Sequence, residues 1–334
     1  MSPGRPDDGT IRTALALAGR APSVHNTQPW LWRLGPGSVH LVADEGRRLP
    51  ATDPDGRDLL VSCGAALHHL RAAFAGLGWA TRVHRLPNPA DPTHLAAVEP
   101  HPAAATDEQI GLISAIGRRR TDRRGYSSWP VPVQYLDLFA ERAAEEGVLA
   151  IPVTDGGHRQ ALTAAIDLAA VEQDRADGYG SELRLWTGRG RGAADGVPMS
   201  AAPAAAVAHG GVRMRDFSAG TLTPSPADAY EDDAGALLVL ATSGDDALSR
   251  LRAGEAASAV LLAATAAGMA TCPLSQPLEV PATRAAVRDR VLDGSAVPQL
   301  VLRVGWPHAS AAPLPASPRR PVAELLTASP GAAP

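Results

Sequence analysis

GAALHHLRAAFAGLG (residues 64–78) is a largely apolar segment with a glycine at its first and last positions, and this pattern occurs twice in the chain. The second copy, GEAASAVLLAATAAG (254–268), has the same length, so its two glycines are also fourteen residues apart. Glycine commonly closes helices. We interpret each glycine pair as opening and closing a buried helix, and the sequence around the two pairs predicts helices at 58–79 and 253–270.

The sequences that flank these segments turn the similarity into a prediction of domain organisation. An apolar, partly β-branched stretch precedes and follows each helix, as is typical of strands. The strand–helix–strand order therefore occurs twice, which indicates a divergent duplication. The first lobe is predicted to end near residue 105 and the second to span the rest of the chain. The matched strands are SVHLVAD (38–44) with ALLVLATS (236–243), and ATRVHRL (80–86) with PQLVLRVGW (298–306).

Between these elements, periodicity predicts further helices and one irregular segment. Residues 187–226 are rich in glycine, alanine and proline and have little period. Such a long segment inside a compact chain is usually functional or disordered. The further helices are predicted at 8–19, 107–121, 132–146 and 157–186.

Composition limits the classes of function. The net charge of −4 gives no global basic field, which argues against nucleic acid and anionic membranes as partners. No leader-like segment and no uncharged run of transmembrane length is present, so a cytoplasmic protein is expected. All 31 basic residues are arginine. Chemistry that needs lysine is therefore excluded, and anions must be bound by arginine or by backbone amides.

Basic side chains are concentrated in RRRTDRR (118–124), which holds five arginines and Thr121 at a predicted helix end. A solvated basic turn is the simpler interpretation of a charge run. However, so many like charges repel one another unless an anion lies among them. Arginine forks beside a hydroxyl group suit a phosphate. A second basic pair, Arg319 and Arg320, is available to close on the same anion.

Polar side chains of another kind are gathered in APSVHNTQPW (21–30). Its hydroxyl, amide and ring groups suit the hydroxyls or heterocycle edge of a ligand. Local backbone bonding by Ser23 and Asn26 in a turn is the structural alternative. His68 and His69 are interpreted as core residues rather than metal ligands, and no metal is expected. Cys63 and Cys272 are expected to be reduced, small core residues, although one bridge between them stays open.

Taken together, these motifs resemble the nitroreductase superfamily of FMN enzymes. APSVHNTQPW is similar to that family's A-P-S-x-x-N-x-Q-P-W segment, and RRTDR (119–123) to its R-R-S-x-R motif. GMATCPLSQ (268–276), LVLRVGWP (300–307) and PRRPVAELL (318–326) resemble its C-terminal third. The resemblance implies an α+β fold in which helices surround a mixed or antiparallel sheet.

The order of the motifs departs from the ordinary family, in which the arginine motif comes first. Here each lobe keeps a different half of one composite site. This arrangement resembles the two-lobed Acg-type branch, a fused intramolecular pseudo-dimer with a single FMN. The resemblance implies lobes 1–105 and 106–334, with a lid insertion at about 188–225. It also implies a monomer or a weak homodimer.

The resemblance assigns the chemistry to flavin N5 and to no side chain. NAD(P)H would be the electron donor and a small molecule, such as a nitroaromatic or a quinone, the acceptor. The alternative is a protein that stores or sequesters FMN under a closed lid without turnover. Leu274, Ser275 and Gln276 replace the Glu-Gly pair that ordinary members often carry near N5. The implied FMN-binding residues are Pro22, Ser23, Asn26, Gln28, Arg119, Thr121, Arg123, Leu274, Ser275, Gln276, Arg319 and Arg320.

Overall fold

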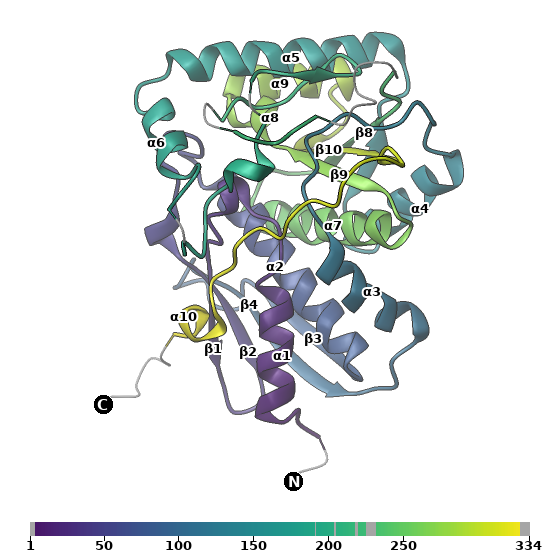
Figure 1. Ribbon diagram of the computed structural model, residues 1–334. Helices are drawn as coiled ribbons and strands as arrows, with labels where there is room; N and C mark the ends of the chain where they lie inside the picture. Colours follow the sequence, from purple (N-terminus) through teal and green to yellow (C-terminus); the bar gives the residue numbers. More distant parts are fainter. Residues whose placement is uncertain (1–3, 191, 204, 218–219, 225–231, 328–334) are drawn as a thin grey trace.

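The chain forms two four-stranded antiparallel sheets with helices packed around them (Figure 1). The computed structural model describes residues 4–190, 192–203, 205–217, 220–224 and 232–327. The first sheet has the order β1-β2-β4-β3 and the second the order β5-β8-β10-β9. The strands are β1 (Trp30–Leu34), β2 (Val39–Ala43), β3 (Trp79–Arg85), β4 (His94–Pro102), β5 (Leu149–Pro152), β8 (Ala236–Thr242), β9 (Ala270–Leu274) and β10 (Val297–Gly305), with a small separate pair β6 (Ala208–His209) and β7 (Val212–Arg213).

Helices cover both faces of the second sheet. In the second sheet Leu238 and Leu240 face one core with α4 and α7, whereas Leu237 and Val239 face another core with α5 and α9. Burial of both faces explains why β8, the strand that carries these four residues, is apolar throughout. The helices are α1 (Asp8–Ala18), α2 (Arg57–Gly76), α3 (Asp107–Arg118), α4 (Val133–Ala144), α5 (Gly156–Arg175), α6 (Tyr179–Leu185), α7 (Ala247–Ala266), α8 (Gln276–Glu279), α9 (Pro281–Val291) and α10 (Val322–Leu325).

Helices α2 and α7 cross in the middle of the molecule, between the two sheets (Figure 1). At the crossing, a Cβ added to Gly64 would lie 2.0 Å from the carbonyl oxygen of Leu251, and one added to Gly254 would lie 1.9 Å from that of Val61. In each pair of equivalent residues the numbers differ by 190, so the contact is reciprocal, as across a two-fold axis. The absence of side chains at both glycines lets the two backbones touch.

The role predicted for these two glycines is therefore wrong in part. Gly64 and Gly254 do not open their helices, because α2 begins at Arg57 and α7 at Ala247. Gly78 and Gly268 do follow the helix ends, each with φ at +86°, as expected of glycine after a helix C-terminus.

The strand orders of the two sheets can be compared to examine the predicted duplication. The sheets correspond strand for strand: β1 to β5, β2 to β8, β4 to β10 and β3 to β9. This correspondence supports two tandem lobes, and the boundary near residue 105 stays a prediction. It also corrects one match, because ATRVHRL forms β3, whose counterpart is β9, whereas PQLVLRVGW forms β10, the counterpart of β4.

Two further expectations need correction or restriction. The helix predicted at 157–186 is interrupted, since α5 ends at Arg175 and Gly178, with φ at +82°, precedes α6. Of the segment expected to act as a lid, 188–225, residues 191, 204, 218–219 and 225 lie outside the described part of the chain. Among the residues that are described, no helix has the length and apolar character needed to cross a membrane.

Candidate functional site

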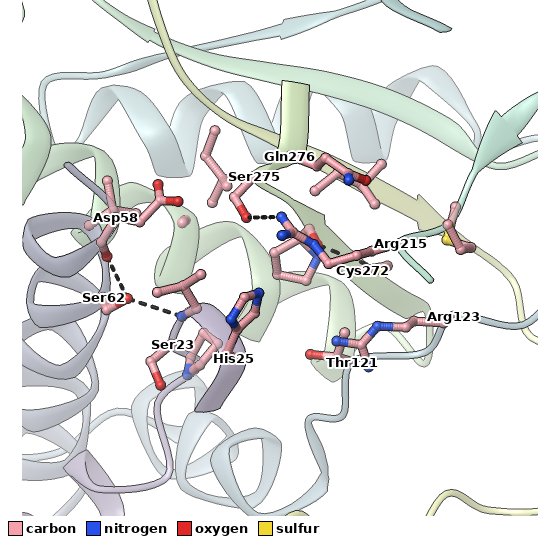
Figure 2. A pocket seen from close by; sticks show the side chains of 18 of the residues that line it. Ser23, His25, Asp58, Ser62, Thr121, Arg123, Arg215, Cys272, Ser275 and Gln276 are labelled. Carbon is pink, nitrogen blue, oxygen red and sulfur yellow. Dashed lines mark hydrogen bonds between the residues drawn. The ribbon is translucent and has the colours of Figure 1, made fainter. Parts of the chain in front are cut away.

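A pocket of about 110 Å³ lies beside the two central helices, α2 and α7 (Figure 2). One water needs only about 10–15 Å³ on a comparable measure, so this space suits an organic ligand. Both central helices contribute to it, with Asp58, Ser62 and Ala65 from α2 and Ala257 and Leu261 from α7. Chain segments far apart in sequence complete the lining: residues 22–25, 213–215 and 272–277 together with Thr121, Arg123 and Phe217.

Part of the predicted ligand set lines this pocket and part does not. The residues that line it come from both lobes, as the composite-site interpretation requires. Asn26, Gln28, Arg119, Arg319 and Arg320 are not among the lining residues. Those that line it are Pro22, Ser23, Thr121, Arg123, Leu274, Ser275 and Gln276.

Asn26 and Gln28 instead hold two other segments in place. The Asn26 amide nitrogen donates to the carbonyl oxygens of Gly196 (2.9 Å) and Pro318 (3.1 Å). The Gln28 amide nitrogen donates to Ala194 O at 2.9 Å, and its oxygen accepts from the backbone N–H of Arg320 at 2.9 Å. Both side chains therefore tie residues 194–196 and the C-terminal stretch to the first lobe.

The backbone of this turn is unusual. His25, Asn26 and Gln28 have φ values of 47°, 54° and 49°, in the left-handed region that side chains other than glycine's disfavour. Ser23 Oγ accepts from the backbone N–H of Gln28 at 2.9 Å, so the local-turn alternative holds for this side chain. The strained turn sets the directions of its side chains, with His25 toward the pocket and Asn26 toward residue 196.

Beside the pocket lies a cluster of four arginines, Arg20, Arg119, Arg120 and Arg319, which we call the arginine cluster. Arg119 is 5% exposed, and its Nε and Nη1 atoms are buried without a hydrogen-bond partner. Burial, Arg120 and Arg20 lower the pKa of Arg119 to about 10. Burial and the other three arginines lower the pKa of Arg319 to about 9. Within the described residues none of the four forms an ion pair, so the cluster lacks a counter-charge.

The other basic residues predicted to bind the same anion are placed elsewhere. Arg320 lies 3.4 Å from Asp44, and Arg124 lies 2.7 Å from Asp122. Arg118 is exposed at the end of α3. Arg123 reaches the pocket, where it donates to Ala201 O at 2.7 Å and lies over the ring of Phe217 at 4.8 Å.

One face of α2 connects the pocket with the arginine cluster. Asp58, Ser62, Ala65 and His69 follow one another at helical spacing, so they lie on the same face. Eleven residues separate the first from the last, which is about 16 Å along a helix. Arg119 and Arg319 both lower the pKa of His69, after burial, so this residue lies near the cluster. This face of α2 therefore runs from Asp58, which lines the pocket, to His69 near the arginine cluster.

Burial controls the protonation of the groups inside the pocket. The pKa of Asp58 is raised well above its ordinary value by burial, followed by the charges of Asp53 and Glu279. The pKa of His25 is lowered well below its ordinary value by burial, followed by Arg215 and Arg123. At neutral pH His25 is therefore uncharged, and the pocket disfavours the charged form of Asp58.

Comparison with known proteins gives this geometry a family. No family model matches the chain. A Mycobacterium tuberculosis protein named "Putative NAD(P)H nitroreductase Rv3131" is 46% identical over 322 residues, which span 96% of this chain and 92% of that protein. The chain belongs to the nitroreductase family. A second protein of that organism, "Putative NAD(P)H nitroreductase acg", is 38% identical over 95% of both chains, so the predicted Acg-type resemblance is confirmed.

Solved nitroreductase structures resemble the chain more distantly. The FMN-dependent nitroreductase NfnB from Mycobacterium smegmatis, in complex with NADPH, is 17% identical with a TM-score of 0.40, covering 65% of this chain and 97% of that chain. A structure named as that of a "putative nitroreductase" from Anabaena variabilis is 11% identical with a TM-score of 0.42, covering 91% of this chain and 90% of that chain.

Several residues of this nitroreductase site were missed by sequence reasoning. Arg20 directly precedes the motif APSVHNTQPW, and its position beside a predicted ligand segment was an available signal. His25 lies inside that motif at a position to which the resemblance assigned no role. Asp58 carried no local signal, since it lies in a buried helix. Arg215 lies in VRMRDFSAG (212–220), a stretch that resembles the lid of the Acg-type branch but to which no single binding residue was assigned. The described residues contain no group of three or more His, Cys, Asp or Glu arranged for a metal ion. Cys63 and Cys272 are both buried and unbridged.

Proposed function

We propose that this chain binds FMN, with the phosphate in the arginine cluster and the ring system in the pocket, and that it is an NAD(P)H-dependent oxidoreductase. The observation that carries the proposal is the pair of buried, unpartnered N–H groups of Arg119 in a cluster without carboxylates. Leaving such groups unsatisfied is costly. A phosphate dianion supplies the missing acceptors and the missing charge.

The dimensions of the site also fit FMN. The face of α2 between the arginine cluster and Asp58 spans about 16 Å, about the length of a phosphate, a ribityl chain and a flavin ring together. Ser23 and Thr121 line the pocket and would contact the middle of such a ligand, and Leu261 and Ala65 would add apolar contacts to its ring system. When bound, FMN supplies the redox chemistry, accepting a hydride equivalent from a nicotinamide and passing electrons to an acceptor.

The protein's own contribution is electrostatic. Arg123 lines the pocket, and no ion pair with a carboxylate is found for it in the described residues. A positive charge beside the ring system stabilises negative charge that develops on reduction. Met214 and Phe217, from the segment expected to act as a lid, line the pocket and would shield a bound ring system from water. A nitroaromatic or a quinone is the class of acceptor we propose.

FMN titration of the flavin-free protein tests the cofactor assignment. Arg119→Ala is expected to weaken FMN binding about 10- to 100-fold, because a charged hydrogen-bonding group is lost. Arg118→Ala, which alters an exposed neighbour, is the matched control and should bind FMN like the wild type. Equal quenching of flavin fluorescence by Arg119→Ala and wild-type protein would contradict the proposal.

A second candidate, storage or sequestering of FMN, is favoured by the number of bonds that hold the lid. Residues 194–196 are bonded to Asn26, Gln28 and Arg47. Arg215 pairs with Glu279 and donates to the hydroxyl of Tyr179 at 2.8 Å. Anaerobic mixing with NADPH separates the two candidates. Fast bleaching of the flavin favours the enzyme, whereas bleaching only after deletion of residues 196–215 favours storage.

A further inference from the structure

His25 is a buried pocket residue whose hydrogen-bonding capacity is unused. The side chain is 6% exposed, and neither ring nitrogen has a hydrogen-bond partner. Figure 2 shows its imidazole within the pocket, with the side chains of Arg123 and Arg215 both on one side of it. Because this ring is kept neutral, it carries one N–H donor and one lone pair.

A simple packing role explains this arrangement poorly. His25 contacts Phe217 edge to face, with 6.1 Å between the ring centres, and a phenylalanine would make such a contact as well. Burying an unsatisfied polar group costs about 1–3 kcal/mol. Its left-handed backbone adds strain of about 1 kcal/mol or more. Such costs gather at ligand sites, where the missing partner arrives with the ligand.

The charges around His25 indicate which atom that partner carries. Arg215 pairs with Glu279, and burial raises the pKa of Asp58 well above its ordinary value, which disfavours the charged form of that carboxyl. Arg123 forms no ion pair with a carboxylate in the described part of the chain. The positive charge of Arg123 therefore lies near the imidazole without a paired carboxylate, and this charge favours a negatively charged oxygen over a neutral or cationic group.

We propose that His25, flanked by Arg123 and Arg215, binds an anionic oxygen of an aromatic ligand, such as an aromatic carboxylate. The imidazole N–H donates to that oxygen, and the apolar wall that includes Met214 and Leu274 receives the ring. This subsite rests on the proposed function in one respect, since the ligand is taken to be the electron acceptor. It makes His25 a determinant of acceptor specificity in a pocket whose other contacts are mainly apolar.

Binding to the FMN-loaded protein, without reductant, tests the subsite. The probes are 4-nitrobenzoate, 4-nitrobenzamide and 4-nitrobenzylamine, which have similar shapes and differ in charge. Difference absorbance of the flavin gives their dissociation constants. We expect wild-type protein to bind the anion about tenfold more tightly than the amide and to bind the amine most weakly.

Variants at position 25 isolate the imidazole. His25→Phe keeps the edge-to-face packing and should bind 4-nitrobenzoate about tenfold more weakly. His25→Gln keeps a donor and should recover part of the affinity. His158→Phe, which alters a half-exposed histidine on α5 outside the pocket, is the matched control.

Three outcomes would overturn the subsite. In the first, the wild-type protein shows no preference for the anion. In the second, His25→Phe binds 4-nitrobenzoate as tightly as the wild type. In the third, His25→Phe loses affinity for FMN and for the probe in parallel. In the third case His25 would serve the cofactor instead. The proposed function fails separately, since it requires FMN binding by the wild type and its weakening in Arg119→Ala, whatever the probes do.

Discussion

At the scale of single residues, burial of neutral histidine is a recurring feature of this molecule. His68 and His69 on α2 both lie 2.7 Å from the hydroxyl oxygen of Ser258 on α7. The pKa of His68 is lowered to about 4, first by burial, which outweighs the opposite influence of Glu146. The pKa of His69 is lowered well below its ordinary value, again first by burial.

These shifts predict a loss of stability in mild acid. An unfolded histidine takes up its proton near pH 6.5, whereas folded His68 does so only near pH 4. The stabilisation is therefore complete above pH 6.5 and is lost as the pH falls from there toward 4. Between pH 6.5 and 5 the free energy of unfolding should fall by about 2 kcal/mol from His68 alone.

Urea denaturation at pH 7.5 and pH 5 measures this effect. His68→Gln keeps a polar side chain of similar size that does not titrate, and its loss of stability should be smaller by about 2 kcal/mol. Identical losses in the wild type and in His68→Gln would show that this residue is not protonated on unfolding.

The residue scale is also where prediction from sequence reached its limit. The motif RRRTDRR predicted a basic region beside a ligand, and the structure does gather Arg119 and Arg120 without acidic partners. However, the same run sends Arg124 to Asp122 and Arg123 to the pocket. Directions of consecutive side chains in an irregular segment depend on backbone angles that the residue types do not specify. The side-chain directions of Asn26 and Gln28 were unpredictable for the same reason. Their positive φ angles turn both amides toward residues 194–196.

At the scale of elements, the crossing of α2 and α7 is the contact that joins the two sheets. The helices were predictable, since their apolar content and closing glycines are visible in the sequence. Their crossing point was not, because a glycine inside a helix gives the same local signal as one at its start. The sequence also matched β3 with β10 instead of with its true counterpart, β9. This strand was missed because it is short and begins only two residues after Gly268.

The crossing makes a prediction for two alanine variants. In Gly64→Ala or Gly254→Ala the new methyl group would lie about 2 Å from a backbone carbonyl oxygen, which cannot move like a flexible side chain. Each variant should lose at least about 3 kcal/mol of stability, through overpacking of the helix crossing.

Gly111→Ala in α3 is the matched control. Nothing lies within 4 Å of the added carbon there, so this variant should be unchanged or about 0.5–1 kcal/mol more stable. Thermal and urea denaturation measure the stability of the three variants relative to the wild type. Similar midpoints for Gly64→Ala and Gly111→Ala would rule out the close crossing.

At the scale of the whole molecule, a buried ion cluster also joins the lobes. Glu255 on α7 is fully buried and lies 2.8 Å from Arg71 on α2 and 2.6 Å from Arg85 on β3. Glu146, between α4 and β5, lies 2.6 Å from Arg71. Burial raises the pKa of Glu255, and the two arginines oppose this rise.

Removal of one member of this cluster should be costly. Glu255→Ala leaves two partly buried guanidinium groups short of a partner and should cost about 3–5 kcal/mol. Glu108→Ala removes a 63% exposed partner of Arg142 and should cost less than about 1 kcal/mol. In urea denaturation, the double variant Arg71→Leu, Glu255→Ala should be more stable than Glu255→Ala. A Glu255→Ala protein as stable as Glu108→Ala would contradict this view of the cluster.

The reciprocal register of α2 and α7 also bears on how such a chain can evolve. Residues 190 positions apart correspond to each other in the two helices. Ala65, which lines the pocket, corresponds to Glu255, and Leu261, which also lines it, corresponds to Arg71; Glu255 and Arg71 form the buried ion pair. Small and apolar side chains on one side of the crossing thus correspond to a filled, charged interior on the other. In a symmetric pair of identical subunits every mutation appears on both sides at once. A chain that carries both halves escapes this coupling, so one half can specialise in binding while its counterpart becomes scaffold.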